Sequence, residues 1–206
     1  MLFGLIIGFT VFAAFAMFVR EGLWSNTIAL IQIMISGLIA FCFYPPLTVL
    51  VDEQTDGQYT FLLDIVMLWA IYCVTLVVLK IVTESLSKKR MAFVPEQLDD
   101  FAGPLVGLAA GVLLAGFVGA SLHLAPLPRD GLGNGMNYKP GELRSAPLYA
   151  LDVLWLNVVE GASAAGFGGS PEFSAEEFVS VYGDRRETYE RAPGMRVERA
   201  GGRANR

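Results

Sequence analysis

The segment from Asp99 to Pro126 constrains the fold more than any other part of the chain. It carries no charged residue between Gly103 and Leu122. Its small residues recur at every fourth position, at Gly103, Gly107, Gly111, Ala115 and Gly119. On an α-helix this spacing keeps them on one face over about 24 Å. Each interior glycine costs a soluble helix roughly 1 kcal/mol, whereas a bilayer tolerates glycine and close helix packing uses it. The segment is therefore predicted to be a membrane-spanning helix with a small-residue ridge.

The composition divides the chain into an apolar part and a polar part. Of its 206 residues, 54% are hydrophobic and 17% are charged, whereas about a quarter are charged in a typical soluble domain. Residues 1–126 hold five Lys or Arg and nine Asp or Glu, and residues 127–206 hold ten and eleven. We expect a transmembrane domain at 1–126 and a polar C-terminal tail at 127–206. The net charge of −5 argues against nucleic-acid binding, which requires a basic surface.

Four apolar runs are each long enough to cross a bilayer, at residues 1–19, 26–50, 60–83 and 101–125. The first lacks the basic start and small-residue cleavage site of a signal peptide, so we interpret it as an uncleaved span. Its Gly4 and Gly8 offer a possible partner face for the ridge. Pro45-Pro46 predicts that the second helix ends or kinks near Tyr44. The predicted fold class is an all-α integral membrane protein with four transmembrane helices and a small, partly disordered helical tail.

A few polar residues interrupt the apolar part. Gln32 and Ser36 share one face of the second run, and an inward structural position is favoured for them over a transport site. Asp64 is a functional candidate because acids within spans are costly, although its place near the end of the third run favours a structural role. Asp99 and Asp100 suit the positive end of the dipole of the glycine-rich helix, which favours capping over acid–base catalysis. Gln32, Ser36, Asp64 and Asp100 remain the candidate functional polar residues.

The tail is predicted to contain two short amphipathic helices, at 146–160 and 175–190. The first places Leu148, Leu151, Trp155, Val158 and Val159 on an apolar face. Its polar residues, Asp152, Asn157 and Glu160, include no cation, so packing against the bundle is favoured over attachment to anionic lipid. Ser174 to Glu177 forms a capping box in front of the second helix. Pro128 to Gly141 is predicted to be a loop, and the chain from Ala192 onward to be disordered.

Motifs of common enzyme classes are missing from the sequence. There is no metalloprotease HExxH, no GxSxG elbow, and neither of the glycine-rich phosphate-binding motifs. The single histidine, His123, is expected to straddle the membrane interface. Cys42 and Cys73 lie in apolar runs, which favours buried free thiols over a disulfide or metal site. We expect no catalytic residue, cofactor site or metal site, and the chain is not predicted to be an enzyme.

Two glycine-containing motifs carry a family resemblance. The last span opens with Asp100-x-x-Gly103-x-x-x-Gly107-x-x-x-Gly111, and Arg20-Glu-Gly22-Leu-Trp24 lies between the first two spans. Together they resemble the colicin V production protein (CvpA-like) family over roughly residues 1–125. The resemblance implies an integral inner-membrane protein linked to toxin production or export and to envelope maintenance, with no accepted reaction. Residues 1–19 lack the acidic side chain that this family often carries in its first span.

Two functional hypotheses follow. The leading one is a non-enzymatic scaffold or export accessory in the bacterial inner membrane, acting through helix association with a second copy or with other membrane proteins. The alternative is a small-solute or proton-coupled transporter that uses Asp64, Gln32 and Ser36 as an oligomer. Basic residues at Arg20 and at 88–90 place the first and third loops in the cytoplasm.

Overall fold

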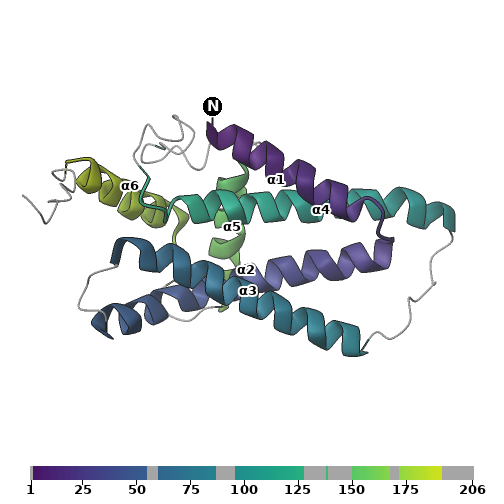
Figure 1. The fold of residues 1–206 in the computed structure, drawn as a ribbon, viewed down its shortest axis with the longest axis horizontal. Coiled ribbons are helices and arrows are strands. Elements are labelled where there is room, and N and C mark those ends of the chain that lie inside the picture. Colours follow the sequence, from purple (N-terminus) through teal and green to yellow (C-terminus); the bar gives the residue numbers. More distant parts are fainter. Residues whose placement is uncertain are drawn as a thin grey trace, which may run out of the picture.

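The computed structural model of the chain describes residues 2–54, 60–86, 96–127, 138, 150–167 and 172–191. Within these residues every regular element is an α-helix. Four long helices lie along the length of the molecule: α1 (Leu2–Phe18), α2 (Leu23–Gln54), α3 (Thr60–Leu86) and α4 (Glu96–Leu122). α5 (Leu151–Ala164) crosses them near the middle, and α6 (Ala175–Arg191) lies at the end of the molecule where α4 finishes (Figure 1).

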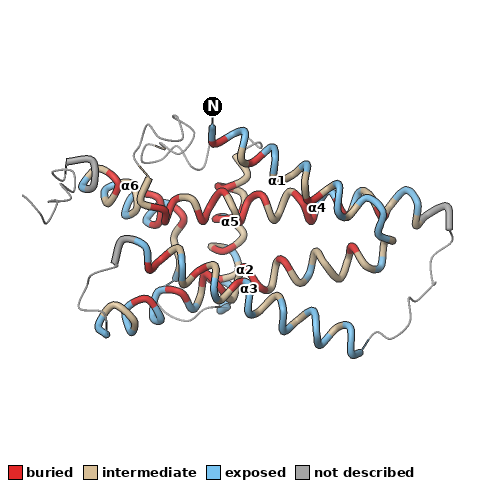
Figure 2. Tube along the Cα trace, viewed as in Figure 1, coloured by how far each residue is buried: buried red, intermediate tan, exposed pale blue. Residues whose placement is uncertain are grey.

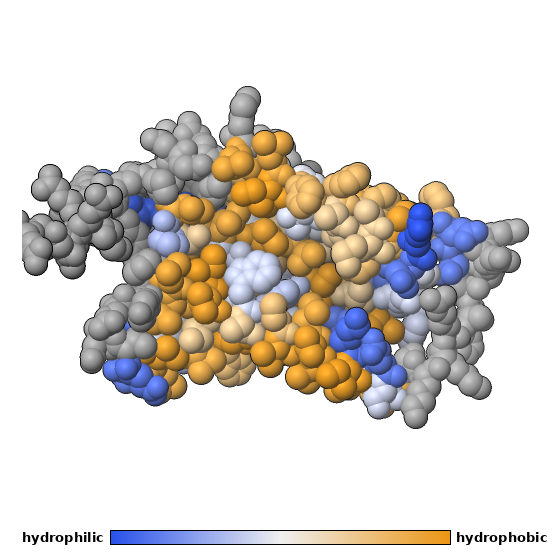
Figure 3. All heavy atoms as spheres, in the orientation of Figure 1, coloured by the Kyte–Doolittle hydropathy of each residue, from blue (hydrophilic) through white to orange (hydrophobic). Residues whose placement is uncertain are grey.

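Three helices are long and apolar enough to cross a membrane, at Leu23–Gln54, Leu62–Leu86 and Asp99–Leu122. α1 is also apolar but has 17 residues, the lower end of the usual range for a span. Large apolar side chains of α1 and α3 are exposed, including Phe9, Phe12, Val74 and Ile81. In the space-filling view, apolar residues cover the middle of the visible face and the most polar described residues lie toward the two ends (Figure 3). The all-helical, membrane-type fold expected from the sequence is confirmed for the described residues.

α2 does not end near Tyr44. The helix continues through Pro45-Pro46 to Gln54, although each proline leaves one helical hydrogen bond unmade. Tyr44 and Thr48, on either side of the proline pair, are both buried. Packing on both sides of the prolines keeps the chain helical, as neighbouring helices often do for prolines in membrane spans. Of the two outcomes expected near Tyr44, a helix end or a kink, the helix end is therefore wrong.

α4 also differs from the predicted span, because it begins at Glu96 rather than at residue 101. The loop predicted at 128–141, apart from Tyr138, and the segment predicted to be disordered from Ala192 onward lie outside the described residues. α5 itself begins at Leu151, and no side chain caps it at Ala150. α6 begins at Ala175, where the Glu177 backbone N–H donates to Ser174 Oγ over 3.4 Å.

The small-residue ridge of α4 faces α1 along its length. A Cβ on Gly107 would lie 2.8 Å from Phe18 Cβ, and a Cβ on Gly111 would lie 3.2 Å from Ala14 Cβ. As residue numbers rise by four on α4 they fall by four on α1, so the two helices are antiparallel. Gly103 meets the turn after α1, and Gly119 meets Ile7. We call this contact, formed by Gly103, Gly107, Gly111, Ala115 and Gly119 on one side and α1 on the other, the glycine seam.

The expected partner face on α1 is wrong. Nothing lies within 4 Å of a Cβ built on Gly4 or Gly8, and both glycines are exposed. α1 instead contributes larger residues to the seam, among them Ile7 and Phe18. Small residues on one helix are enough for close approach, because the opposing side chains then fill the groove.

α5 packs against a second glycine face that the sequence analysis did not identify. The indole of Trp155 is fully buried against Gly37 of α2, and its Cβ lies 3.1 Å from the position of a Gly116 Cβ on α4. The Trp155 ring also meets Phe117 edge to face at 5.7 Å. Buried residues concentrate where α4 and α5 cross (Figure 2). The tail helix α5 is therefore part of the core of the helical bundle.

Candidate functional site

Asn26 joins three parts of the chain at the turn between α1 and α2. Its side-chain amide nitrogen lies 3.0 Å from the Phe18 carbonyl oxygen, 3.2 Å from that of Glu21 and 2.8 Å from that of Gly103. The side chain is fully buried. The two N–H donors of one amide group are therefore shared among carbonyls at the end of α1, in the turn and on α4, which fixes the start of the glycine seam.

Asp99 caps a helix other than its own. Its Oδ1 accepts a hydrogen bond from the Leu23 backbone N–H at the start of α2, with an N–O distance of 2.6 Å. A Cβ on Gly22 would lie 2.9 Å from Asp99 Oδ2, so glycine leaves room for the carboxylate at this turn. Asp99 therefore does cap a helix, but that helix is α2; α4 begins at Glu96, so Asp99 lies within its first turn and not before it.

We expect Asp99→Ala to lower the free energy of unfolding by about 0.5–2 kcal/mol, the usual cost of losing a helix cap. Thermal melting of the solubilised protein measures this change. Asp100→Ala is the matched control, since Asp100 is exposed and the structure records no hydrogen bond for its side chain; its effect is expected to stay within about 0.5 kcal/mol. Equal losses for the two variants would contradict the cap.

Asp64 anchors α6 to α3. The Asp64 carboxylate is buried, and it forms an ion pair with Arg185 and accepts a hydrogen bond from Tyr182 Oη over 3.1 Å. Tyr182 Oη also lies 3.3 Å from Tyr44 Oη of α2. Burial raises the pKa of Tyr182, so its hydroxyl keeps the proton that it donates to Asp64. These four residues connect α2, α3 and α6.

A second polar cluster joins α6 to α5 and to the end of α4. His123 Nε2 lies 3.0 Å from Asp152 Oδ2, and both side chains are fully buried. Tyr138 Oη donates to the same carboxylate at 3.0 and 3.1 Å. Arg186 Nη2 lies 3.5 Å from His123 Nδ1. Because a guanidinium only donates, Nδ1 must accept and Nε2 must carry the proton shared with Asp152.

We call the residues of these two clusters the α6 anchor: Tyr44, Asp64, His123, Tyr138, Asp152, Tyr182, Arg185 and Arg186. Tyr182, Arg185 and Arg186 are spaced so that they lie on one face of α6. Arg185 contacts Asp64 directly. Its neighbour Arg186 contacts His123, which in turn contacts Asp152. Asp64, His123, Asp152 and Arg186 of the anchor are buried, and each has a polar partner from another part of the fold, which is the condition for placing such groups in an apolar interior.

The predicted candidate residues do not come together. Gln32 Nε2 donates to Thr83 Oγ1 over 2.6 Å, which ties α2 to α3. Ser36 is fully buried, and its hydroxyl has no hydrogen-bond partner in the described part of the chain. Asp64 belongs to the α6 anchor, and Asp100 lies exposed on α4. No group of three or more His, Cys, Asp or Glu residues able to hold a metal is found among the described residues.

His123 and the cysteines also differ from expectation. His123 is buried and hydrogen-bonded, so it does not straddle an interface. Both cysteines are free, but Cys42 is half-buried and Cys73 is exposed on α3. In an apolar span, lipid-facing and core-facing positions are both apolar. The hydropathy of the surrounding sequence therefore could not show whether each thiol points into the bundle or away from it.

The main residue of the α6 anchor that the sequence pattern did not identify is Asp152. It was assigned to a polar face with Asn157 and Glu160, yet it is fully buried while Asn157 is exposed. Asp152 lies three, four and seven positions before Trp155, Leu156 and Val159, which are all buried. This helical spacing is a signal in the sequence that could have placed the acid on the core face.

A family model described as colicin V production protein matches residues 2–148. The match therefore spans 147 of the 206 residues and includes all of α1 to α4. It continues past residue 125, where the resemblance was expected to end. Comparisons with curated proteins and with solved structures gave no match.

Proposed function

The chain belongs to the colicin V production protein family, and from this premise we propose that it is a non-enzymatic membrane scaffold. In this proposal it is a multi-pass protein of the bacterial inner membrane that assists toxin production or export and envelope maintenance. Its partners are the lipid bilayer and either a second copy or another membrane protein. The family match and the membrane-type helices support the membrane location.

One observation carries the proposal: polar side chains of the membrane helices are used to join helices. Asn26 bonds to carbonyls of α1 and α4, Gln32 bonds to α3, and Asp64 bonds to α6. Each contact stabilises a boundary between elements. A bundle whose buried polar groups hold its helices together is suited to keep a fixed shape, which is what a scaffold requires.

The transporter alternative has less support, because its three residues lie in different places. Gln32 binds Thr83, and Thr83 is 19 residues beyond Asp64 on the same helix. At 1.5 Å per residue this separates the two sites by about 28 Å along α3. Asp64 is moreover already paired with Arg185. A proton or solute pathway would need these groups along one connected route.

We also propose that α1 is a fourth span and that the turn after it is cytoplasmic. Asp99 places the start of α4 beside the start of α2, so the first and third connections share one end of the bundle. Arg20 and the basic residues at 88–90 belong to these two connections, and such residues are enriched on the cytoplasmic side. α5 and α6 then belong to the opposite half of the molecule.

The double variant Asp64→Asn, Arg185→Gln tests the scaffold proposal. It removes both charges of the pair and keeps groups that can still hydrogen-bond. We expect it to lower stability by at most about 1 kcal/mol, since Arg185 is partly exposed, and to restore toxin production in cells that lack the native chain. The measurement is the toxin released, at equal amounts of the protein in the membrane.

Arg185→Gln alone is the matched control, because it leaves the Asp64 carboxylate buried without its cation and should be the less stable variant. A stable, fully inserted double variant that produces no toxin would contradict the scaffold proposal. That result would favour a role for the Asp64 carboxylate in proton-coupled transport.

A further inference from the structure

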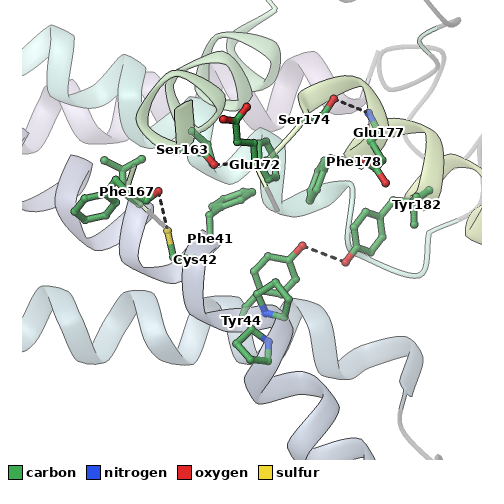
Figure 4. Close-up of a pocket in the computed structure, with 16 residues that line it drawn as sticks. Phe41, Cys42, Tyr44, Ser163, Phe167, Glu172, Ser174, Glu177, Phe178 and Tyr182 are labelled. Atoms are coloured by element: carbon green, nitrogen blue, oxygen red, sulfur yellow. Dashed lines mark hydrogen bonds between the residues drawn. The ribbon is translucent and has the colours of Figure 1, made fainter. Parts of the chain in front are cut away.

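A pocket of about 560 Å³ lies between α2, the end of α5 and the start of α6. Its lining is largely apolar, with Phe41 and Pro45 from α2, Val159 from α5, Phe173 from the segment before α6 and Phe178 from α6 itself. Figure 4 shows aromatic rings of α2 and α6 around the pocket, with Cys42 on its α2 side. The volume is within the range of about 300–1,000 Å³ that is usual for small-molecule sites.

The charged residues that line this pocket are both acidic. They are Glu172 and Glu177, and among the described residues no Lys or Arg contributes to the lining. Both glutamates are exposed, and neither carboxylate forms an ion pair within the described residues. Glu177 and its neighbour Glu176 lie in the first turn of α6, where they already complement the positive end of the helix dipole. The pocket therefore disfavours an anion and favours a cation at its polar edge.

The apolar wall of the pocket continues into a surface suited to lipid. The lining residues of α2 begin at Leu38, near the middle of that 32-residue helix, and extend to Pro46. Phe43 and Leu47, on the same stretch of α2, are exposed large apolar residues. Val181, which also lines the pocket, is 48% exposed on α6. Exposed apolar side chains therefore adjoin the pocket on both α2 and α6.

We propose that this pocket binds a membrane lipid whose headgroup carries a primary amine, with one acyl chain against the aromatic wall and the ammonium group at the acidic edge to which Glu172 and Glu177 belong. A primary ammonium carries a compact charge and three hydrogen-bond donors, and a carboxylate at that edge supplies acceptors for them. Anionic lipids would place like charge against the same carboxylates. This inference goes beyond the scaffold proposal and requires only that the helices lie in a membrane.

The two native cysteines provide a test. Cys42 lines the pocket and Cys73 is exposed on α3 away from it, so Cys73→Ser leaves a thiol inside the site and Cys42→Ser leaves one outside it. Each protein is placed in nanodiscs of phosphatidylcholine alone, or with phosphatidylethanolamine or phosphatidylglycerol added. The rate of thiol modification by an uncharged alkyl methanethiosulfonate is then measured.

We expect phosphatidylethanolamine to slow modification of Cys42 several-fold, phosphatidylglycerol to leave it unchanged, and Cys73 to react at the same rate in all three. Glu172→Gln with Glu177→Gln should abolish the protection, while Glu53→Gln, on α2 outside the pocket, should preserve it. Thermal melting checks that each variant remains folded. Equal Cys42 rates in all lipids, equal protection by phosphatidylglycerol, or protection that survives the double Gln change would each overturn the proposal.

Discussion

Gly111→Leu is expected to lower the free energy of unfolding by about 3 kcal/mol or more. Overpacking costs about 1–3 kcal/mol where the surroundings can yield, and more where they cannot. A first carbon at Gly111 would already lie 3.2 Å from Ala14 Cβ, 3.5 Å from the Val11 carbonyl oxygen and 3.6 Å from the Phe15 nitrogen. Two of these three atoms belong to the backbone of α1, so the helices must separate. Thermal melting in detergent measures the loss.

Ala109→Leu is the matched control for Gly111→Leu. Ala109 lies on the same helix two residues earlier, but it is exposed. The substitution Ala109→Leu therefore introduces the same leucine side chain away from the seam. Leu114 is less suitable, because i and i+3 lie on nearly the same side of a helix and Leu114 is half-buried against the core. Equal melting temperatures for Gly111→Leu and Ala109→Leu would show that the ridge does not pack against α1.

Asp152→Leu is the second variant expected to have a large effect, with a loss of about 3–5 kcal/mol, because the buried donors of His123 and Tyr138 lose their acceptor at about 1–3 kcal/mol each. The change leaves His123, Tyr138 and Arg186 without the carboxylate that their network requires. Because the cluster holds α6 against α5, the same variant should make α6 accessible to protease. Melting temperature and cleavage within α6 are the two measurements.

Asn157→Leu is the control on the same helix. Asn157 is exposed, so this substitution adds apolar area without disturbing the α6 anchor and should change stability by no more than about 0.5 kcal/mol. If Asp152→Leu melts like the wild-type chain and α6 stays resistant to protease, the anchor does not hold the tail helices in place.

The α4 ridge could be predicted because its information is local. A repeat of small residues at every fourth position specifies a face of a helix without reference to any other segment. The opposing face of α1 could not be predicted in the same way. α1 is apolar on all sides, with Thr10 as its single polar residue. Its sequence therefore shows no helical periodicity that would distinguish a lipid-facing side from a packed side.

The α6 anchor depends on contacts between residues far apart in the sequence. Asp64 and Arg185 are 121 residues apart, and His123 and Asp152 are 29 apart. The identity of Asp64 as a costly intramembrane acid was visible in the sequence, but its partner was not. For Asp99 the residue type indicated a capping role, whereas the helix that it caps was decided by the position of α2 beside α4.

The measurement that tests the glycine seam most directly is a disulfide between positions 14 and 111 in native membranes. Ala14 Cβ and the position of a Gly111 Cβ are 3.2 Å apart, close to the Cβ–Cβ separation of about 3.5–4.5 Å in disulfides. With Cys42 and Cys73 replaced by Ser, oxidation of the Ala14→Cys, Gly111→Cys chain should give a crosslinked monomer. The Gly8→Cys, Gly111→Cys chain should give none, because nothing lies near Gly8. A covalent dimer through position 111, or no crosslink in the first chain, would contradict a ridge that packs within its own chain.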